Sequence, residues 1–387
     1  MNTKELIKIE DDYFINTFTR QPLILDHGEG VKVYDIEGNE YIDMFAGIAV
    51  NCLGHNHPKL VETIQKQASK LIHISSIYYN EPALVYAKKL IDLTSFDRIF
   101  YANSGAEANE GAIKLAVKYT GKSEIISTVD SFHGRTIMTL AATGHEEYHE
   151  PFKAVLPKGF INVEYNNIEA IKEAVNENTA AIIIEPVQGE GGVNVPDENY
   201  LKEVEKLCHE KGIVLIIDEV QTGFGRCGTL FAHELFGIKP DIVTMAKGIG
   251  GGVPMGGILA TDEIASAFVP GDHGTTFGGG PLVAAAANAV LDVILDEDLL
   301  SHVNEVGEYF ISQLKKLDKE IIAEVRGKGL MVGLELTKAG AEYVDKLREK
   351  GFLINCTADK VLRFVPPLII TKEEIDLFIK ALDEVLE

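Results

Sequence analysis

A lysine and an aspartate follow two neighbouring apolar runs of the chain, and these two side chains can do chemistry together. Asp218 follows the run Gly212 to Ile217, and Lys247 stands between the run Ile242 to Met245 and a glycine-rich turn. Such short apolar runs predict buried parallel strands, whose carboxyl ends meet at one edge of a sheet. The sequence therefore predicts an amine and a carboxylate at that edge. A lone lysine beside a loop is usually only solvated, so the interpretation depends on its companions.

A predicted helix start supplies the first companion. Asn103-Ser-Gly105-Ala106 follows the predicted strand Arg98 to Tyr101 and opens a helical pattern. The first amides of a helix have no partner within the helix and lie at the positive end of its dipole, so they can bind phosphate. An amine, a carboxylate and a phosphate site together are what pyridoxal 5'-phosphate (PLP) needs. Lys247 would condense with its aldehyde, and Asp218 would keep its ring nitrogen protonated.

A second turn adds an aromatic ring and a cation. Ser131-Phe132-His133-Gly134-Arg135 follows the predicted strand Glu124 to Ser127. Phe132 could lie flat against a pyridine ring, although a single Phe is more often an ordinary core residue. Arg135 is a candidate fork for a substrate carboxylate, and a surface salt bridge is the alternative.

Two other patterns are interpreted as accidental. The stretch Gly223 to Gly228 matches GxGxxG, but Asp218 and Glu219 precede it and would repel a pyrophosphate, so no dinucleotide site is predicted. His55-Asn-His57 has no partner at ligand spacing, so no metal is predicted.

The composition excludes several classes of partner. The chain has 387 residues and a formal net charge of −23, from 59 acidic and 36 basic residues. Nucleic acids and anionic membrane surfaces attract concentrated Lys and Arg, so neither is an expected partner. The four cysteines form no CxxC pair, the first residues lack the apolar core of a signal peptide, and no apolar stretch approaches the ~20 residues of a bilayer span. We therefore expect a cytoplasmic protein with reduced thiols.

The order of apolar runs and helical patterns predicts an α/β fold. From about residue 56 to 280, short β-rich runs alternate with helices, as in a mainly parallel sheet with helices on both faces. A long helical stretch is then predicted over about 283–317, followed by strands, a helix near 339–350 and a last helix that a capping box at Thr371 to Glu374 opens. The first ~50 residues suggest short strands and turns. The expected division is an N-terminal segment 1–55 packed with the small domain, a large domain 56–282 and a small α+β domain 283–387.

Taken together, these segments resemble the class III (ω-amino acid) aminotransferases of PLP fold type I, and within them the acetylornithine aminotransferases. The likeness covers nearly the whole chain and follows the order of motifs in that family. The segments that carry it are 46–58, Asn103 to Glu110, Ser131 to Thr136, Glu185 to Gly192, Asp218 to Gly223, Ala246 to Gly252 and His273 to Gly279.

The resemblance implies a set of residues for the cofactor. By position, Lys247 would bind the PLP aldehyde, Asp218 would pair with the ring nitrogen, and Phe132 would stack on the ring. Further implied cofactor contacts come from Gly105, Ala106, Glu219, Val220, Gln221 and Thr276. Because Thr276 reaches the phosphate of the neighbouring subunit in this family, the resemblance also implies a homodimer with shared active sites.

The resemblance also implies the substrates. Arg135, with Thr275 beside it, would bind the carboxylate farthest from the reacting amine; Arg363 would bind the near carboxylate of glutamate, and Glu190 would pair with Arg363 as a switch. The implied reaction, a step of arginine biosynthesis, transfers the δ-amino group of N2-acetyl-L-ornithine to 2-oxoglutarate and gives N-acetyl-L-glutamate 5-semialdehyde and L-glutamate. Departures from the family pattern occur at Thr275, Gly280, Cys227 and the substrate-side segment Ser75 to Asn80.

Several alternatives stay open at this point. Ornithine, succinylornithine, 4-aminobutyrate and carrier-bound lysine-biosynthetic amines are substrates of related aminotransferases. A glutamate-1-semialdehyde aminomutase or a dialkylglycine decarboxylase would keep the cofactor and change the reaction. A catalytically silent PLP-fold binding protein is the alternative from another class, and intact Lys247, Asp218 and Arg363 count against it.

Overall fold

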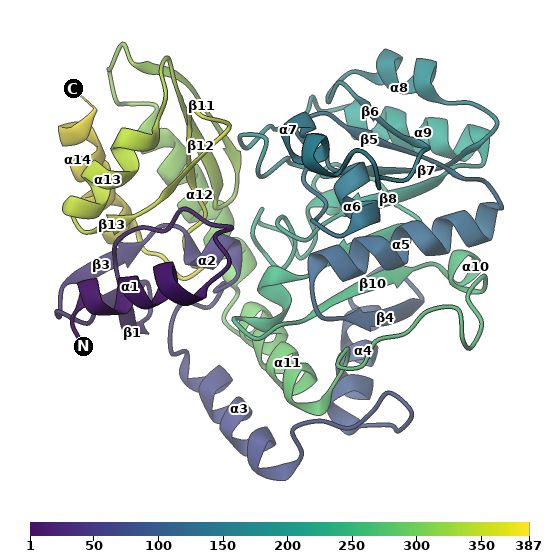
Figure 1. Ribbon diagram of the computed structural model, residues 1–387, viewed down its shortest axis with the longest axis horizontal. Helices are drawn as coiled ribbons and strands as arrows, with labels where there is room; N and C mark the ends of the chain where they lie inside the picture. The colour runs from purple at the N-terminus through teal and green to yellow at the C-terminus, as the bar shows by residue number, and fades with distance from the viewer. Residues whose placement is uncertain (387) are drawn as a thin grey trace.

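The large sheet of the protein has seven strands in the order β4-β10-β9-β8-β7-β5-β6, in a computed structural model that describes residues 1–386 (Figure 1). Pairing is parallel from β9 through β8, β7 and β5 to β6, whereas β10 runs antiparallel to both β9 and β4. The predicted α/β fold with a mainly parallel sheet is confirmed. The strands are β4 (Arg98–Ala102), β5 (Glu124–Thr128), β6 (Phe160–Val163), β7 (Thr179–Ile184), β8 (Val214–Asp218), β9 (Ile242–Met245) and β10 (Gly256–Ala260).

Helices cover both faces of this sheet because its central strands are apolar on both sides. Successive side chains of a strand point to opposite faces. Ile183 of β7 shares an apolar cluster with Ile113 of α5 (Gly105–Thr120), whereas its neighbour Ile182 belongs to the cluster that contains Leu201 of α9 (Tyr200–Lys211). The helix α5 begins at a Ser104 cap, whose hydroxyl accepts a hydrogen bond from the Glu107 amide. Because Ser104 follows β4, this cap places the first turn of α5 at the carboxyl ends of the strands.

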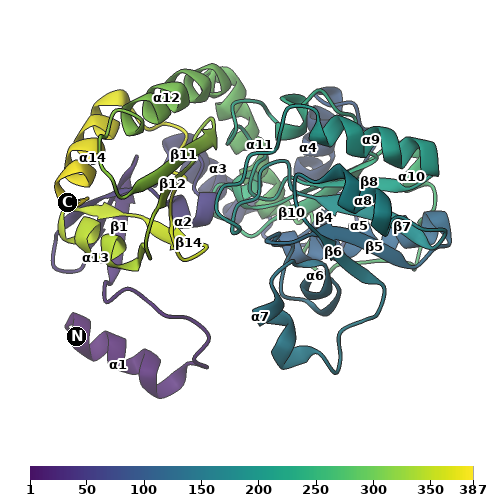
Figure 2. The same cartoon turned by 90° about the horizontal axis from the view of Figure 1, so that it is seen from above.

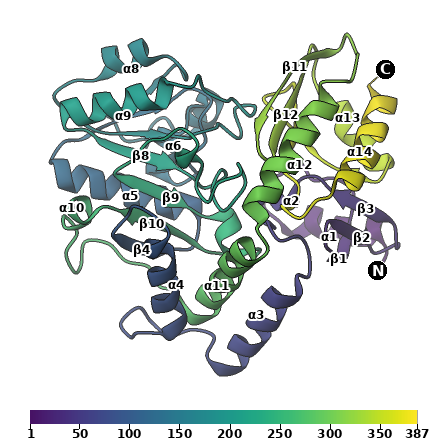
Figure 3. The same ribbon diagram turned by 180° about the vertical axis from the view of Figure 1, so that it is seen from behind.

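Shorter helices connect these strands. They are α6 (Ile137–Ala142), α7 (Glu146–His149), η1 (Glu150–Phe152), α8 (Ile168–Ala174), η2 (Ala232–Glu234), η3 (Lys247–Gly250) and α10 (Asp262–Ala265). A separate group of long helices lies at the base of the molecule, where α11 (Pro281–Asp296) contacts both α3 (Pro58–Lys70) and α4 (Glu81–Asp92) (Figure 3).

Two four-stranded sheets make up the other part of the molecule. In one, β3 pairs with β13 in parallel, so the N-terminal and C-terminal parts of the chain share a sheet in the order β1-β2-β3-β13. The other has the order β11-β12-β15-β14, and α12, α13 and α14 belong to the same C-terminal part. The bounds are β1 (Leu25–Glu29), β2 (Lys32–Asp35), β3 (Glu40–Asp43), α2 (Ala46–Ala49), α12 (Leu299–Leu314), β11 (Ile322–Lys328), β12 (Met331–Leu336), α13 (Ala341–Glu349), β13 (Phe352–Leu353), β14 (Asn355–Thr357), β15 (Val361–Phe364) and α14 (Lys372–Val385).

The predicted domain boundaries stay a proposal. The shared sheet supports grouping residues 1–55 with the C-terminal part. Because α11 contacts α3, α4 and η3, we place the second boundary nearer residue 297 than 282.

One expectation about local structure is wrong. The chain begins with α1 (Thr3–Tyr13) rather than a strand, because Asn2 and Glu5 form a capping box; Figure 2 shows α1 apart from the sheets, and none of its residues is buried. The long helical stretch predicted over 283–317 is confirmed, and it consists of two helices, because Asp298 has a left-handed backbone (φ 50°) that separates α11 from α12. Among residues 1–386, no helix is both long enough and apolar enough to cross a membrane.

Candidate active site

A cavity of about 520 Å³ opens at the carboxyl ends of β8 and β9, beside the start of α5. Ligands bind at this edge in open α/β sheets because loops there leave the strand ends exposed. The predicted site residues that line the cavity are Gly105, Ala106, Phe132, Arg135, Glu190, Asp218, Val220, Gln221 and Lys247. These residues come from five separate segments of the sequence, which the fold brings into one site.

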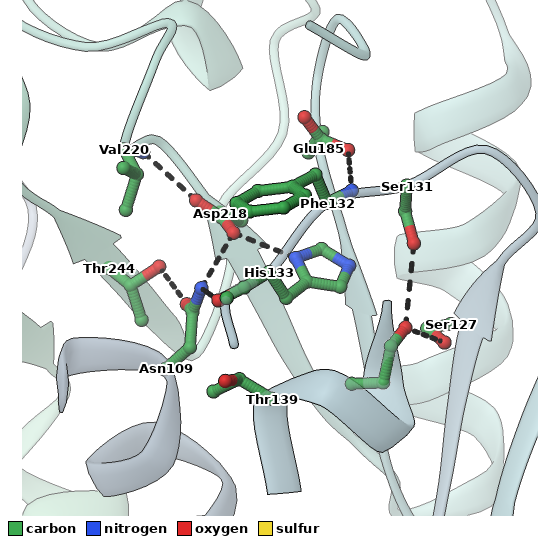
Figure 4. Close-up of polar contacts among 12 residues, drawn as sticks. Asn109, Ser127, Ser131, Phe132, His133, Thr139, Glu185, Asp218, Val220 and Thr244 are labelled. Atoms are coloured by element: carbon green, nitrogen blue, oxygen red, sulfur yellow. Dashed lines mark hydrogen bonds and ion pairs between the residues drawn. The ribbon is translucent and has the colours of Figure 1, made fainter. Parts of the chain in front are cut away.

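The floor of the cavity is a network of hydrogen bonds around Asp218 (Figure 4). Its Oδ2 accepts hydrogen bonds from Asn109 Nδ2 at 2.8 Å and from His133 Nδ1 at 2.7 Å, and its Oδ1 accepts one from the Val220 amide at 3.0 Å. The side chain of Asp218 is only 3% exposed. A buried carboxylate is costly unless it is hydrogen-bonded, and three donors meet that requirement and fix the direction of the carboxylate.

Asn109 and His133 are functional candidates that the sequence interpretation missed. Asn109 is held in turn, because its Oδ1 accepts a hydrogen bond from Thr244 Oγ1 at 2.6 Å, and its Nδ2 also donates to the His133 carbonyl. Since a carboxylate only accepts, His133 must carry its proton on Nδ1. Asn109 lies four residues after Gly105 on α5, within a motif that the sequence singled out, so helical spacing was the available signal.

Lys247 takes a strained backbone conformation at the end of β9. Its φ is 47°, in the left-handed region that residues other than glycine rarely occupy and that costs on the order of 1–3 kcal/mol. Burial lowers the pKa of the Lys247 amine below its ordinary value; Arg363 acts in the same direction, and Glu190 and Asp218 oppose it. The site therefore favours a neutral amine more than water does.

Glu185, at the end of β7, is a buried acid that the sequence interpretation left without a role. One carboxylate oxygen accepts a hydrogen bond from the Phe132 amide and the other from the Gly189 amide, each at 3.1 Å. Burial raises the pKa of Glu185 to about 7, and Asp218 adds to this effect while His133 opposes it. Glu185 thus connects the turn that carries Phe132 with the loop that leads to Glu190.

Glu190, in the wall of the cavity, forms an ion pair with the buried Arg363, which does not itself line the cavity. Glu190 Oε1 lies 2.6 Å from Arg363 Nη1, which also donates to Gln221 Oε1 at 3.2 Å. The Arg363 side chain is 1% exposed and that of Glu190 is 28% exposed. Burial acts to raise the pKa of Glu190, but the positive charges of Arg363 and Lys247 outweigh it, so this pKa lies below its usual value. Arg363 also donates from Nε to the side-chain oxygen of Asn355 at 3.2 Å.

The rim of the cavity holds an arginine of a different kind. Arg135 is exposed, and its Cζ lies 3.5 Å from the centroid of the Tyr148 ring and 5.5 Å from that of Phe132. Among residues 1–386, no carboxylate forms an ion pair with Arg135. Gly134 makes the turn possible, since its φ is 141° and an added Cβ would lie 2.8 Å from the Cβ of Ala106.

Four predicted site residues do not line this cavity: Arg363, described above, and Glu219, Thr275 and Thr276. Glu219 is fully buried behind β8, where it contacts Thr222 and accepts a hydrogen bond from the His233 amide at 2.7 Å, so its side chain faces away from the predicted cofactor site. Thr275 and Thr276 line a neighbouring cavity of about 400 Å³, and Asn103, which donates to Thr275 Oγ1 at 2.9 Å, lines both.

The residues at the site fit PLP. Lys247 offers an amine, the floor offers a fixed carboxylate, and the first turn of α5 offers amides at a point where a Cβ on Gly105 would lie 2.7 Å from Val220. No group of three or more His, Cys, Asp or Glu side chains suited to a metal ion occurs in the part of the chain that the structure describes.

Comparison with known proteins identifies the family. The sequence model of the family described as aminotransferase class-III matches residues 15–386, and the chain belongs to this family of PLP-dependent transferases. It is 53% identical to the acetylornithine aminotransferase of Methanothermobacter thermautotrophicus over all of this chain and 99% of that protein.

Solved structures agree with this assignment. The acetylornithine aminotransferase of Elizabethkingia anophelis has a TM-score of 0.89 and 35% identity, over 100% of this chain and 99% of that one. An ornithine aminotransferase of Toxoplasma gondii, with PLP at its active site, has a TM-score of 0.96 and 32% identity, over 100% of this chain and 94% of that one. The PLP fold type I expected from the sequence is confirmed.

Proposed function

We propose that this aminotransferase transfers the δ-amino group of N2-acetyl-L-ornithine to 2-oxoglutarate, and so acts in arginine biosynthesis. The observation that carries the proposal is the contrast between the two arginines at one cavity. Arg363 is paired with Glu190, whereas Arg135 has no acidic partner among the described residues. The full-length similarity to acetylornithine aminotransferases points to the same substrate.

In this proposal, Lys247 holds the aldehyde of PLP and Asp218 pairs with the ring nitrogen. Phe132 packs on the ring, Gln221 and Val220 contact its edge, and the first amides of α5 at Gly105 and Ala106 bind the phosphate. When bound, PLP supplies an electron sink and carries the amino group from one substrate to the other. Glu219 is no longer proposed as a direct contact, because its side chain bonds to His233.

Proton transfer falls to Lys247. Burial lowers the pKa of its amine, so the neutral form that can accept a proton is favoured once the amine is free. The amine could then take the proton from the substrate carbon that bears the reacting nitrogen, hold it on Nζ and release it within the site. Asp218 keeps its charge at a fixed place throughout, since three donors hold its carboxylate.

Two substrates of different shape must use this one site. Acetylornithine has no carboxylate next to its reacting amine, and an unpaired Arg363 would then be a buried cation without a partner. Glu190 removes that cost by pairing with Arg363. Glutamate brings its own near carboxylate, and Glu190 must leave Arg363 to admit it. Arg135 binds the far carboxylate of both substrates, so it needs no switch.

We also propose that the protein is a homodimer in which Thr276 completes the partner's site. Large apolar side chains are exposed beside Thr276 and in the loop between α3 and α4, including Phe277 at 63%, Ile77 at 82% and Tyr79 at 91%. The two places are adjacent, since the ring centroid of His73 in that loop lies 5.1 Å from that of Phe277. Such a patch is typical of an interface.

Mixing Lys247→Ala and Thr276→Ala proteins should restore activity, because a mixed dimer has one site with both lesions and one with neither. If subunits exchange and no activity returns, the sites are not shared.

The test of the substrate is a panel of amines. The purified protein with PLP is mixed with acetylornithine, ornithine, succinylornithine, 4-aminobutyrate or glutamate, and the absorbance change of the bound cofactor is followed in a single turnover. We expect the fastest reactions with acetylornithine and glutamate. The second candidate is an ornithine aminotransferase, and the structural similarity to the Toxoplasma gondii enzyme supports it. A preference for ornithine would favour this candidate. Reaction with none of these amines would leave a silent binding protein.

A further inference from the structure

Tyr148 lies outside the cavity lining and packs against Arg135, the arginine that the proposed function assigns to the substrate carboxylate. It lies in α7, and the Cζ of Arg135 stands 3.5 Å from the centroid of its ring. A guanidinium this close to an aromatic face is attracted by the ring quadrupole. Tyr148 is itself only half-buried and packs against His145, with ring centroids 5.0 Å apart.

The geometry leaves the hydrogen-bonding edge of Arg135 free. A guanidinium presents its N–H donors in its own plane, whereas stacking uses its flat face. The acidic residues of α7 are engaged elsewhere: Glu147 lies 3.3 Å from His145 Nδ1, and Glu146 lies 3.8 Å from His149 Nδ1. The side chain is therefore held in place by aromatic contacts and not by a competing carboxylate.

We propose that Tyr148 is a positioning residue for substrate carboxylates, which acts by holding the Arg135 guanidinium against its ring. An exposed arginine in solution samples many rotamers, and fixing it on binding costs side-chain entropy. A ring that already holds the cation removes part of that cost before the substrate arrives. A glutamate or aspartate in place of Tyr148 would also hold Arg135 but would compete with the substrate for its donors.

This proposal rests on the proposed function of Arg135 and predicts a selective change in KM. Tyr148→Leu should raise KM for both acetylornithine and glutamate about tenfold and leave kcat within about twofold. Tyr148→Phe keeps the ring and should stay within about twofold of the parent in both constants. A straight-chain alkyl monoamine without a carboxylate should react equally with all three proteins.

Matched variants separate this effect from general damage. Tyr119→Leu removes another tyrosine, at the far end of α5, and should change neither KM nor kcat. Arg135→Gln should raise KM for both carboxylate substrates more than Tyr148→Leu does. If Arg135→Gln leaves KM unchanged, the proposed role of Arg135 fails. If Arg135→Gln raises KM and Tyr148→Leu does not, the inference about Tyr148 is wrong.

A second measurement avoids any loss of folding in the leucine variant. Phenylalanines with one, two or three ring fluorines at position 148 have almost the same size but progressively weaker π faces. We expect log KM for acetylornithine to rise stepwise along this series, because the cation is held less well at each step. A flat series would overturn the proposal, since a residue that only fills space would tolerate every member.

Discussion

The floor and the rim of the active site are built on different physical principles. On the floor, Asp218 is buried and receives three hydrogen bonds of fixed direction. On the rim, Arg135 is exposed and rests on the faces of Tyr148 and Phe132. Hydrogen bonds fix one geometry, whereas stacking lets a guanidinium slide and tilt over a ring. We infer that the chemistry common to the family depends on the floor, and that the fit of each substrate depends on the rim.

The wall lies between these extremes. Arg363 is as buried as the floor, but its partner Glu190 is 28% exposed and belongs to a loop. A buried cation with a partly exposed partner suits a pair that opens for one substrate and closes for another.

The largest effect is expected when Asp218, at the centre of the floor, is replaced. Asp218→Asn should lower the rate of the chemical step about a thousandfold, because an amide cannot hold the ring nitrogen's positive charge. The protein should still fold and bind PLP. Asp241→Asn is the matched control: Asp241 accepts a hydrogen bond from the Leu215 amide away from the cavity, and its variant should stay within about threefold. Single-turnover absorbance measures both, and near-normal turnover in Asp218→Asn would contradict the assignment.

A smaller loss is expected when the support of the floor is removed. Asn109→Ala deletes one donor to Asp218, and a hydrogen bond to a charged group contributes about 1.5–3 kcal/mol, so the single-turnover rate should fall about 10- to 100-fold. Asn288→Ala is a suitable control, since Asn288 also lies on a helix and donates to a carbonyl, that of Pro82, outside the site. Equal effects of the two substitutions would show that Asn109 has no special role.

The site residues at the ends of strands and at the start of a helix could be predicted from the sequence. Lys247 and Asp218 were predictable because each follows an apolar run long enough to be a buried strand, and the ends of such strands meet at one edge. Gly105 was predictable because a helix pattern begins there.

The supports of those residues were not predictable from local patterns. Asn109 meets Asp218 across 109 positions and His133 meets it across 85. Helical spacing places Asn109 on the same face of α5 as Gly105, but it does not indicate which distant side chain Asn109 contacts. Glu219 was predicted to contact the cofactor, but side chains next to each other at a strand end point to opposite sides, and Glu219 points away from Asp218. Asp298 could not be foreseen as a break, since the apolar pattern continues through it.

The buried acid Glu185 is expected to give a smaller effect, on stability instead of rate. The pKa of Glu185 is raised to about 7 in the folded protein, above its value in the unfolded chain. The folded state therefore binds this proton more tightly, and its stability falls as pH rises from about 4.5 to about 7, by a few kcal/mol at most. Glu185→Gln cannot ionise, so its free energy of unfolding relative to the parent should increase from pH 5 to pH 8. Urea unfolding measures this difference, and a difference that stays constant with pH would show that Glu185 does not titrate in this range.

Separate half-reactions of Glu190→Ala test most directly whether Glu190 switches Arg363 between two substrates. Removing a buried charge partner costs about 3–5 kcal/mol when unrelieved, and entry of water reduces this cost. Single-turnover rates with acetylornithine should fall at least about tenfold, because Arg363 is left without a partner, while rates with glutamate should stay equal or rise. Arg363→Ala should do the reverse and slow glutamate most. If both substitutions slow both half-reactions by similar factors, the ion pair is structural and the switch does not exist.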